Sequence, residues 1–379
     1  MNPRNYYATL ILPAMMAVLL LSMDSCRKPK PIEPDGNTGP KNRVYYIAAV
    51  EQVWDYAPSG MDMFMGMDFD AMDSVYAVNL PGGPTPRIGR KNIKAHYVEY
   101  TDETFSTPKP IAPEWEHLGI LGPVIRAVVG DSVIVYFKNM TSINASIHVH
   151  GLQYDHNSEG AVYNNGATSG ASIDPGGQYR YQYFTRDDAG PAATQGSSIV
   201  WLYHSHVNMD ESDVYAGLVG AIIVTKRGMA DANAKPLDVD REFITLFMVL
   251  NENSSALLDK NIAAYLPGFT NPNPEDFEES NKKHTINGMF MGNLAGLNMN
   301  KGERVRWYLV ALGNEVDLHT PHWHGNTVTY NGQNTDVLEL LPAAMLTADM
   351  KPDNAGTWGF HCHVSDHMMA GMSALYTVK

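Results

Sequence analysis

Cysteine is almost absent from this sequence, whose 379 residues include only Cys26 and Cys362. The two could form one disulfide. However, Cys26 lies in a targeting segment and Cys362 lies among histidines, so we expect each to have a role other than pairing with the other. Basic residues are in the minority, and the formal net charge of -14 argues against a nucleic-acid partner and mildly favours cationic substrates. Charged residues make up 18% and hydrophobic residues 44%, which indicates a globular protein long enough for two domains.

Long apolar runs are missing apart from a short one near the N-terminus. Arg4 precedes the run from Ala8 to Leu21, which is too short for a comfortable membrane span and is typical of an export signal. Cys26 follows at a position that resembles a bacterial lipoprotein cleavage site. We expect a signal peptide over residues 1–25, a lipid on Cys26, and an exported lipoprotein of the bacterial cell envelope, periplasmic or anchored in the outer membrane. A secreted protein with an incidental cysteine is the alternative.

Long stretches of helical periodicity are missing as well. Residues 26–43 are rich in Pro, Gly and charge, and we expect them to form a flexible tether. From residue 44 onward, short β-rich runs such as 44–47 and 132–137 are separated by turns of Pro, Gly, Asn and Asp. This pattern predicts an all-β sandwich protein.

The chain repeats itself in order and approximate spacing. Stretches of the first half return in the second: 130–133 as 302–305, 148–151 as 322–325, 204–207 as 361–364, and 216–218 as 370–372. The repeat predicts two copies of one β-domain, at residues 44–230 and 236–379. We expect the boundary in the polar stretch 226–240.

A cysteine between two histidines is the most informative motif. Successive side chains of a strand point to opposite faces, so Cys362 faces away from His361 and His363. His319 lies at an odd offset from His322 and therefore shares the cysteine face. Two His and one Cys that bind closely, with a weak axial Met, are the ligands of an electron-transfer copper. We expect an electron to cross through Cys362, and we expect one mononuclear copper with the ligands His319, Cys362, His367 and Met372.

Four His-x-His pairs supply eight imidazoles, a ligand type that suits copper. Each pair lies on one face of its strand because the side-chain period is two. Four pairs from two related domains could meet at an interface and hold three coppers. The predicted cluster ligands are His148, His150, His204, His206, His322, His324, His361 and His363.

The first repeat lacks the ligands of the cysteine site. Its matching positions hold Ala145, Ser205 and Leu218, and no histidine replaces His367. The sequence therefore predicts one mononuclear copper per chain. If the four His pairs hold three coppers, the total is four copper ions per chain.

These motifs resemble those of the multicopper oxidases, which are built from Greek-key cupredoxin domains. The resemblance is greatest to ceruloplasmin-type domains in a two-domain arrangement like that of the small laccases, and it covers most of residues 44–379. Family-like stretches outside the ligands are 54–58, 116–123, 247–253 and 286–288. The resemblance implies that His148 and His322 bind a type 2 copper and that the other six cluster histidines bind a type 3 pair.

The resemblance also implies an activity. The type 1 copper at Cys362 takes electrons singly from a donor, and the cluster gathers them to reduce O2 to water. Two-domain members of the family assemble as homotrimers, with each cluster between domain 1 of one chain and domain 2 of the next. We expect the same assembly here.

The electron donor is left open between metal ions and organic reductants. Ceruloplasmin-like members oxidise Fe(II) with carboxylates near the type 1 copper. Asp366 and Glu252 are the main candidates for that role, and Glu315 and Asp317 are weaker ones. Alternatively, these acids are surface groups or orient the histidines. A laccase-like oxidation of phenols or amines fits the ligands equally well.

Residues 61–72 contain several methionines with interleaved acids. Thioethers are soft ligands that suit Cu(I), so the segment could deliver or oxidise cuprous ions. Apolar filler or a mobile loop is the other interpretation.

Other functions fit part of the pattern. A copper nitrite reductase also has two such domains, but it needs fewer cluster histidines and carries its cysteine copper in the first domain. A copper-sequestering lipoprotein would bind copper and consume no O2. A zinc site is disfavoured because a weak axial thioether is not a zinc preference. Copper content separates the two enzymes, because the reductase holds fewer ions per chain.

Overall fold

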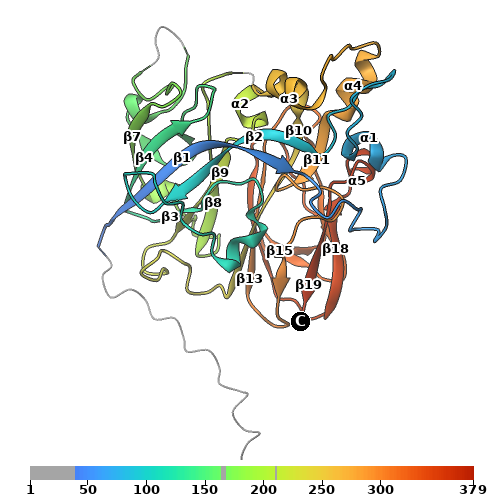
Figure 1. The fold of residues 1–379 in the computed structure, drawn as a ribbon. Helices are drawn as coiled ribbons and strands as arrows, with labels where there is room; N and C mark the ends of the chain where they lie inside the picture. The colour runs from blue at the N-terminus through green and yellow to red at the C-terminus, as the bar shows by residue number, and fades with distance from the viewer. Residues whose placement is uncertain (1–38, 164–167, 210) are drawn as a thin grey trace, which may run out of the picture. The chain divides into compact units, whose positions relative to one another are not determined.

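The computed structural model describes residues 39–163, 168–209 and 211–379, which belong to a compact unit spanning Pro34–Lys379. The predicted signal peptide, most of the predicted tether and Cys26 lie outside the described residues. Strands dominate the regular structure, and the helices are short (Figure 1). The prediction of an all-β protein is confirmed.

The strands of the first half form two sheets. The first sheet has the order β2-β1-β4-β7-β6, with β1 (Asn42–Asp55), β2 (Lys91–Tyr100), β4 (Ser132–Met140), β6 (Gln153–Tyr154) and β7 (Gln178–Phe184). The second has the order β3-β9-β8-β5, with β3 (Ile125–Val128), β5 (His148–Val149), β8 (Ser198–His204) and β9 (Val219–Thr225).

The strands of the second half also form two sheets. The first has the order β11-β10-β13-β17-β15-β16, with β10 (Arg241–Asn251), β11 (Lys282–Ile286), β13 (Val305–Ala311), β15 (Val328–Tyr330), β16 (Gln333–Thr335) and β17 (Met345–Met350). The second has the order β12-β19-β18-β14, with β12 (Asn298–Met299), β14 (Pro321–Trp323), β18 (Gly356–Cys362) and β19 (Ser373–Val378).

The two halves share one topology. In the first sheet of each half, a parallel pair lies beside an antiparallel one: β1 with β4 and β2, and β10 with β13 and β11. In the second sheet of each half, a short strand pairs in parallel with the last strand of that half, β3 with β9 and β12 with β19. We propose that each half is one domain of the repeat, with the change of domain between Thr225 and Arg241.

The burial of residues differs from strand to strand. In β4, buried and half-buried residues alternate, which is the pattern of a strand with one face on a core. Every residue of β9 and β13 is buried. A large core cluster lies mainly in each half, and a third large cluster joins residues of both halves, including Tyr56, Leu202, Ile244 and Tyr308. The two halves are therefore packed together through apolar contacts.

The helices lie in the connections between strands. They are α1 (Asp73–Ala77), α2 (Ser212–Tyr215), α3 (Leu258–Tyr265), α4 (Pro274–Ser280) and α5 (Ser365–Met369), with 3-10 turns η1 (Pro113–Leu118), η2 (His156–Ser158), η3 (Asp187–Ala189) and η4 (Glu252–Ser254). In the described part of the chain, none of them is long and apolar enough to cross a membrane. Figure 1 shows α1, α4 and α5 near one another on the side of the second half.

Candidate metal centres

The cysteine site forms where β14 and β18 pair. The register places Pro321 opposite Cys362 and His322 opposite His361. Because side chains alternate along a strand, Cys362 enters the core of the second half, where it is fully buried. Helix α5 follows β18 closely and carries His367 back toward the same point.

Predicted ligands of the mononuclear copper converge at this point. The Nδ1 atoms of His319 and His367 lie 3.1 Å apart, and Cys362 Sγ lies 3.9 Å and 3.7 Å from them. Met372 is fully buried in the same core cluster, and its backbone oxygen accepts a hydrogen bond from Cys362 N at 3.1 Å. Two imidazoles and a thiol, with the thioether of Met372 in the same core cluster, form a donor set that fits a mononuclear copper.

The environment favours the thiolate form of Cys362. Burial alone would raise the pKa of the thiol, but hydrogen bonds with His319 and His367 outweigh burial and lower the pKa to about 6. Thr320 N also donates to Cys362 Sγ at 3.4 Å. Because thiolates rather than thiols bind metals, the site is prepared for an ion.

The first histidine quartet lies on β5 and β8 and just beyond them, and consists of His148, His150, His204 and His206. His148 pairs with His204 in the strand register, and the Nε2 atoms of His150 and His204 lie 3.1 Å apart. The His206 ring centroid lies 5.2 Å from that of His148. His148 Nδ1 bonds to the Glu159 backbone oxygen at 2.7 Å, and this contact directs Nε2 of His148 to the centre of the quartet.

The second quartet lies on β14 and β18 and just beyond them, and consists of His322, His324, His361 and His363. The Nε2 atoms of His324 and His361 lie 3.0 Å apart, and the rings of His322 and His363 are 5.2 Å apart. His361 Nδ1 bonds to the Cys362 backbone oxygen at 2.8 Å. His324 and His363 are exposed, so this quartet is open on one side.

The nitrogen atoms of both quartets fit a metal. The Nδ1 atoms of His204 and His361 donate to backbone oxygens, so their Nε2 atoms carry lone pairs, and each faces another imidazole nitrogen at 3.0–3.1 Å. A shared cation would stabilise such a contact. Burial lowers the pKa of His150 to about 4, so this imidazole is neutral, the form that binds metals. In the described residues, the buried Nδ1 atoms of His206 and His322 have no hydrogen-bond partner.

The two quartets are separate within the chain. Potential metal ligands group as His148, His150 and His204 on one side and as His322, His324 and His361 on the other. Over residues 39–163, 168–209 and 211–379, no ring of one quartet contacts a ring of the other. A single chain thus presents two half-centres.

Comparison with known proteins identifies the family. Two family models, both described as multicopper oxidase, match residues 118–228 and 267–379. The chain belongs to the multicopper oxidase family. The two matched segments contain both histidine quartets and the cysteine site, and copper is the metal that this family implies.

Curated relatives of this multicopper oxidase are longer proteins, and one of them is named a ferroxidase. The chain is 40% identical over 354 residues to "Ferroxidase HEPHL1" of Mus musculus, covering 90% of this chain and 30% of the relative. It is 39% identical to "Ceruloplasmin" of Ovis aries over 363 residues, covering 94% of this chain and 34% of the relative. It is 39% identical to "Hephaestin" of Homo sapiens over 345 residues, covering 89% and 28%. The chain thus spans about a third of the length of these relatives.

Solved structures show the same fold. A crystal structure of a multicopper oxidase matches with a TM-score of 0.56 at 18% identity, covering 89% of each chain. A second multicopper oxidase, mgLAC, matches with a TM-score of 0.54 at 18% identity, covering 89% of this chain and 86% of the other. The predicted cupredoxin fold is confirmed.

In the first half, a hydrogen-bonded acid lies where the second half has a predicted copper ligand. Counted back from Gly217 and Gly371, Asp213 stands at the position of His367. Asp213 is fully buried, and its Oδ2 accepts a hydrogen bond from Val207 N at 3.2 Å. Burial raises the pKa of Asp213, and a hydrogen bond with Ser205 lowers it in part. The absence of a histidine was predicted from the sequence, but its replacement by Asp213 was not.

The structure gives Glu252 partners other than the cysteine site. Its carboxylate is buried, and Oε1 accepts hydrogen bonds from Lys94 Nζ and the Tyr56 hydroxyl. Lys94 and Tyr56 belong to the first half, so Glu252 lies at the junction of the two halves. This placement favours a structural role over the predicted iron-binding role, because the charge of the carboxylate is already compensated.

His284 lies close to the cysteine site and Glu279 is linked to it through Tyr76, but no role was predicted for either from the sequence. The ring of His284 lies 5.1 Å from that of His367 and 6.0 Å from that of Tyr76. The Tyr76 hydroxyl donates to Glu279 Oε1 at 2.8 Å. His284 Nδ1 is buried and has no hydrogen-bond partner among the described residues. The spacing of Glu279 and His284 matches no metal motif. His284 lies on β11, which pairs with β10, and only this tertiary placement brings its ring next to that of His367.

The exposed Asp366 belongs to the same region. Burial raises the pKa of Tyr76 first, and the charges of Glu279 and Asp366 raise it further. The two carboxylates therefore act on one phenol from the same neighbourhood. Lys282 Nζ forms an ion pair with Glu279 Oε2 at 3.0 Å.

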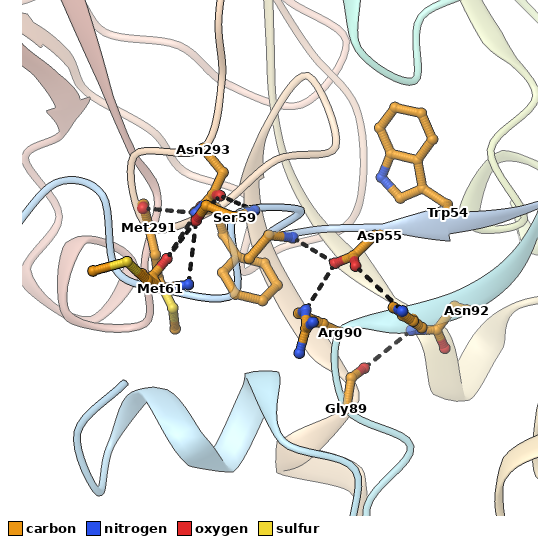
Figure 2. Close-up of polar contacts among 12 residues, drawn as sticks. Trp54, Asp55, Ser59, Met61, Gly89, Arg90, Asn92, Met291 and Asn293 are labelled. Carbon is orange, nitrogen blue, oxygen red and sulfur yellow. Dashed lines mark hydrogen bonds and ion pairs between the residues drawn. The ribbon is translucent and has the colours of Figure 1, made fainter. Parts of the chain in front are cut away.

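The Met-rich segment follows β1 and is tied to the second half (Figure 2). Asn293 Nδ2 donates to the backbone oxygens of Met61 at 3.1 Å and Met291 at 3.0 Å, and Ser59 Oγ donates to Asn293 Oδ1 at 2.6 Å. Several methionine side chains of the segment remain exposed: Met63 at 42%, Met65 at 66%, Met67 at 48% and Met72 at 49%. Their role with Cu(I) stays a prediction.

Proposed function

We propose that this chain is an oxidase that couples one-electron oxidation of a reducing substrate to the four-electron reduction of O2 to water. Copper bound at the cysteine site and between histidine quartets supplies the redox chemistry. One observation carries the proposal. The buried thiol of Cys362 faces His319 and His367, while its two neighbours in the chain, His361 and His363, belong to a quartet.

Strand β18 provides the connection between the two kinds of site. The peptide bonds on either side of Cys362 lead directly to His361 and His363. A second route runs from the Cys362 backbone oxygen to His361 Nδ1 through their 2.8 Å hydrogen bond. An electron that enters at the thiolate therefore needs only a few bonds to reach the quartet.

We propose that a second copy of the chain completes the cluster. Each quartet is incomplete in isolation, the second is open to solvent, and no ring contact joins the two within the described chain. A cyclic homotrimer in which domain 1 of one chain faces domain 2 of the next would unite them. The expected mononuclear and three-copper centres then amount to four copper ions per chain: His319, Cys362, His367 and Met372 for the type 1 ion and the eight quartet histidines for the cluster.

Complementation tests this assembly. One variant loses the first quartet through His148→Ala and His150→Ala, and a second loses the other quartet through His322→Ala and His324→Ala. Each variant alone should fail to reduce O2. Co-expression should restore O2 uptake, because some interfaces then combine two intact quartets. No restoration, together with a monomer in light scattering, would contradict a shared cluster.

We further propose that Fe(II) is the electron donor and that Glu279, His284 and Asp366 bind it. Carboxylate oxygens are hard ligands that stabilise the ferric product and so make Fe(II) a stronger reductant. The His284 ring lies 5.1 Å from that of His367, which places bound iron next to a ligand of the cysteine site. The ion pair of Glu279 with Lys282 is half-exposed and therefore weak, so iron can displace it. The relatives named ferroxidase support the same substrate.

A matched pair of variants tests the iron site. Glu279→Ala should raise KM for Fe(II) at least tenfold, whereas Glu278→Ala, which changes the exposed preceding acid, should leave it unchanged. Oxidation of a small phenol should survive both changes, because a phenol needs no carboxylate. Equal loss of phenol and iron oxidation in Glu279→Ala would place Glu279 in the structure of the copper site instead.

Oxygen consumption separates the oxidase from the rival functions. Copper-loaded protein should consume O2 when supplied with Fe(II), Cu(I) or a phenol, and should form water without releasing peroxide. Copper binding without O2 uptake would favour a copper-sequestering protein. Reduction of nitrite with a lower copper content would favour a nitrite reductase.

We also propose that the protein is exported to the bacterial cell envelope with a lipid on Cys26. This proposal depends on the N-terminal sequence alone, because Cys26 lies outside the described residues. Mass spectrometry of the mature N-terminus should find a diacylated cysteine that Cys26→Ala removes. An unmodified Cys26 would favour a secreted protein without an anchor.

A further inference from the structure

Asp317 is a buried carboxylate beside the cysteine site. It lies in the connection between β13 and β14, and its side chain is 1% exposed. Its Oδ1 accepts hydrogen bonds from His319 Nε2 at 3.1 Å and from Val249 N at 2.7 Å, and its Oδ2 accepts one from Asn314 N at 3.0 Å. The carboxylate thus accepts three N–H donors, one of them the far nitrogen of a predicted copper ligand.

The loop is built around this carboxylate. Gly313 has a φ of +115°, and a Cβ added at Gly313 would lie 2.0 Å from Asp317 Oδ2. Any other residue at this position would displace the carboxylate or strain the backbone. Glycine at position 313 therefore leaves the space that the Asp317 carboxylate occupies.

Among the described residues, no basic side chain pairs with the Asp317 carboxylate. The contacts of Asp317 within the described residues are backbone N–H groups and His319, and none of them is a Lys or Arg. Burial first and the charge of Asp317 second raise the pKa of Glu211. A negative charge in this buried position acts strongly on its neighbours, because little solvent screens it.

The two imidazoles of the cysteine site differ in whether a carboxylate contacts them. His319 Nε2 bonds to a buried carboxylate, whereas the His367 ring packs against the His284 ring at 5.1 Å. In the described part of the chain, no carboxylate bonds to His367. The carboxylate bond fixes the proton of His319 on Nε2 and leaves the lone pair on Nδ1, the atom that faces Cys362 Sγ.

We infer that Asp317 is a positioning residue that holds His319 in the copper-binding tautomer and lowers the reduction potential of the cysteine site. A carboxylate that accepts the far N–H of an imidazole makes that imidazole a stronger donor, and its negative charge favours the more highly charged Cu(II). The inference depends on the type 1 copper proposed above. It also fits an iron donor held by carboxylates, since such a donor reduces a copper of modest potential.

Potentiometry of the copper-loaded protein tests this role. Asp317→Asn keeps the shape and removes the charge, so the site should keep its blue absorption while its potential rises. We expect about a tenfold shift of the one-electron equilibrium toward Cu(I), which corresponds to about 59 mV. Glu315→Gln removes the same charge from an exposed position of the same loop. It should leave the potential within experimental error of that of the wild type.

A second variant guards against a folding defect. Gly313→Ala should displace the carboxylate without removing it, and should shift the potential in the same direction as Asp317→Asn. Potentials of Asp317→Asn and Gly313→Ala that equal that of Glu315→Gln would overturn the inference. A wild-type protein that binds copper without a blue absorption band would instead overturn the proposed type 1 site itself. The two failures are therefore distinguishable.

Discussion

Loss of the Glu252 charge is expected to destabilise the folded protein. Glu252 Oε1 accepts hydrogen bonds from Lys94 Nζ and the Tyr56 hydroxyl, and the charged side chains are 0% and 1% exposed. Glu252→Gln keeps an acceptor for Tyr56 but leaves the Lys94 ammonium without a counter-ion. Removing one partner of a buried ion pair typically costs about 3–5 kcal/mol, because the remaining charge stays in a medium of low polarity. We expect a loss of unfolding free energy of that size.

Urea unfolding followed by tryptophan fluorescence measures this loss. Glu99→Gln is the matched control, because Glu99 pairs with Lys109 at 2.8 Å but the Lys109 side chain is 54% exposed. Such a surface pair contributes about 0.2–1 kcal/mol. Adding Lys94→Met to Glu252→Gln should recover most of the lost stability, since the double variant buries no unpaired charge.

A different result is expected if Glu252 binds iron. If Glu252→Gln unfolds at the same urea concentration as Glu99→Gln but binds Fe(II) more weakly, the carboxylate acts on iron, as the sequence analysis expected. The structural argument for the Lys94 pair would then be wrong.

Other changes have equally definite outcomes. Cys362→Ser should abolish the blue absorption and leave the cluster copper, as optical spectra and metal analysis will show; a variant that stays blue would refute the ligand assignment. Burial lowers the pKa of Lys283 to about 7 from 10.5. Between these values only the unfolded state holds the extra proton, so the unfolding free energy should rise with pH, and Lys283→Met should remove this rise. Gly151→Ala should lower the melting temperature, because its Cβ would lie 2.2 Å from the Trp201 ring at a φ of +75°. An unchanged melting temperature would contradict that contact.

Local rules were enough to predict the arrangement around Cys362. Alternation along a strand separates Cys362 from His361 and His363 whatever the rest of the fold does. The odd offset of His319 from His322 likewise placed His319 on the cysteine face. The pairing of β14 with β18, which brings His322 beside His361, was not predicted and comes from the structure.

Strand alternation could not show which acidic residues lie close to the cysteine site. Glu252 stood in a family-like stretch, yet its partners Lys94 and Tyr56 come from the other half of the chain. Glu279 and His284 matched no motif, although β11 places the His284 ring 5.1 Å from that of His367. Contacts of this kind depend on which strands become neighbours, and sequence spacing carries little information about that choice.

By itself, then, the amino-acid order determined an all-β fold, its repeat and the donor types that gather at each predicted metal centre, because strand alternation acts over a few residues. Only the tertiary structure decided that the two quartets stand apart within one chain, that Glu252 pairs with Lys94 of the other half and that Asp317 bonds to both Val249 and His319. These features arise from the packing of loops and strands that are distant in the chain, where burial and hydrogen-bond satisfaction select the partner.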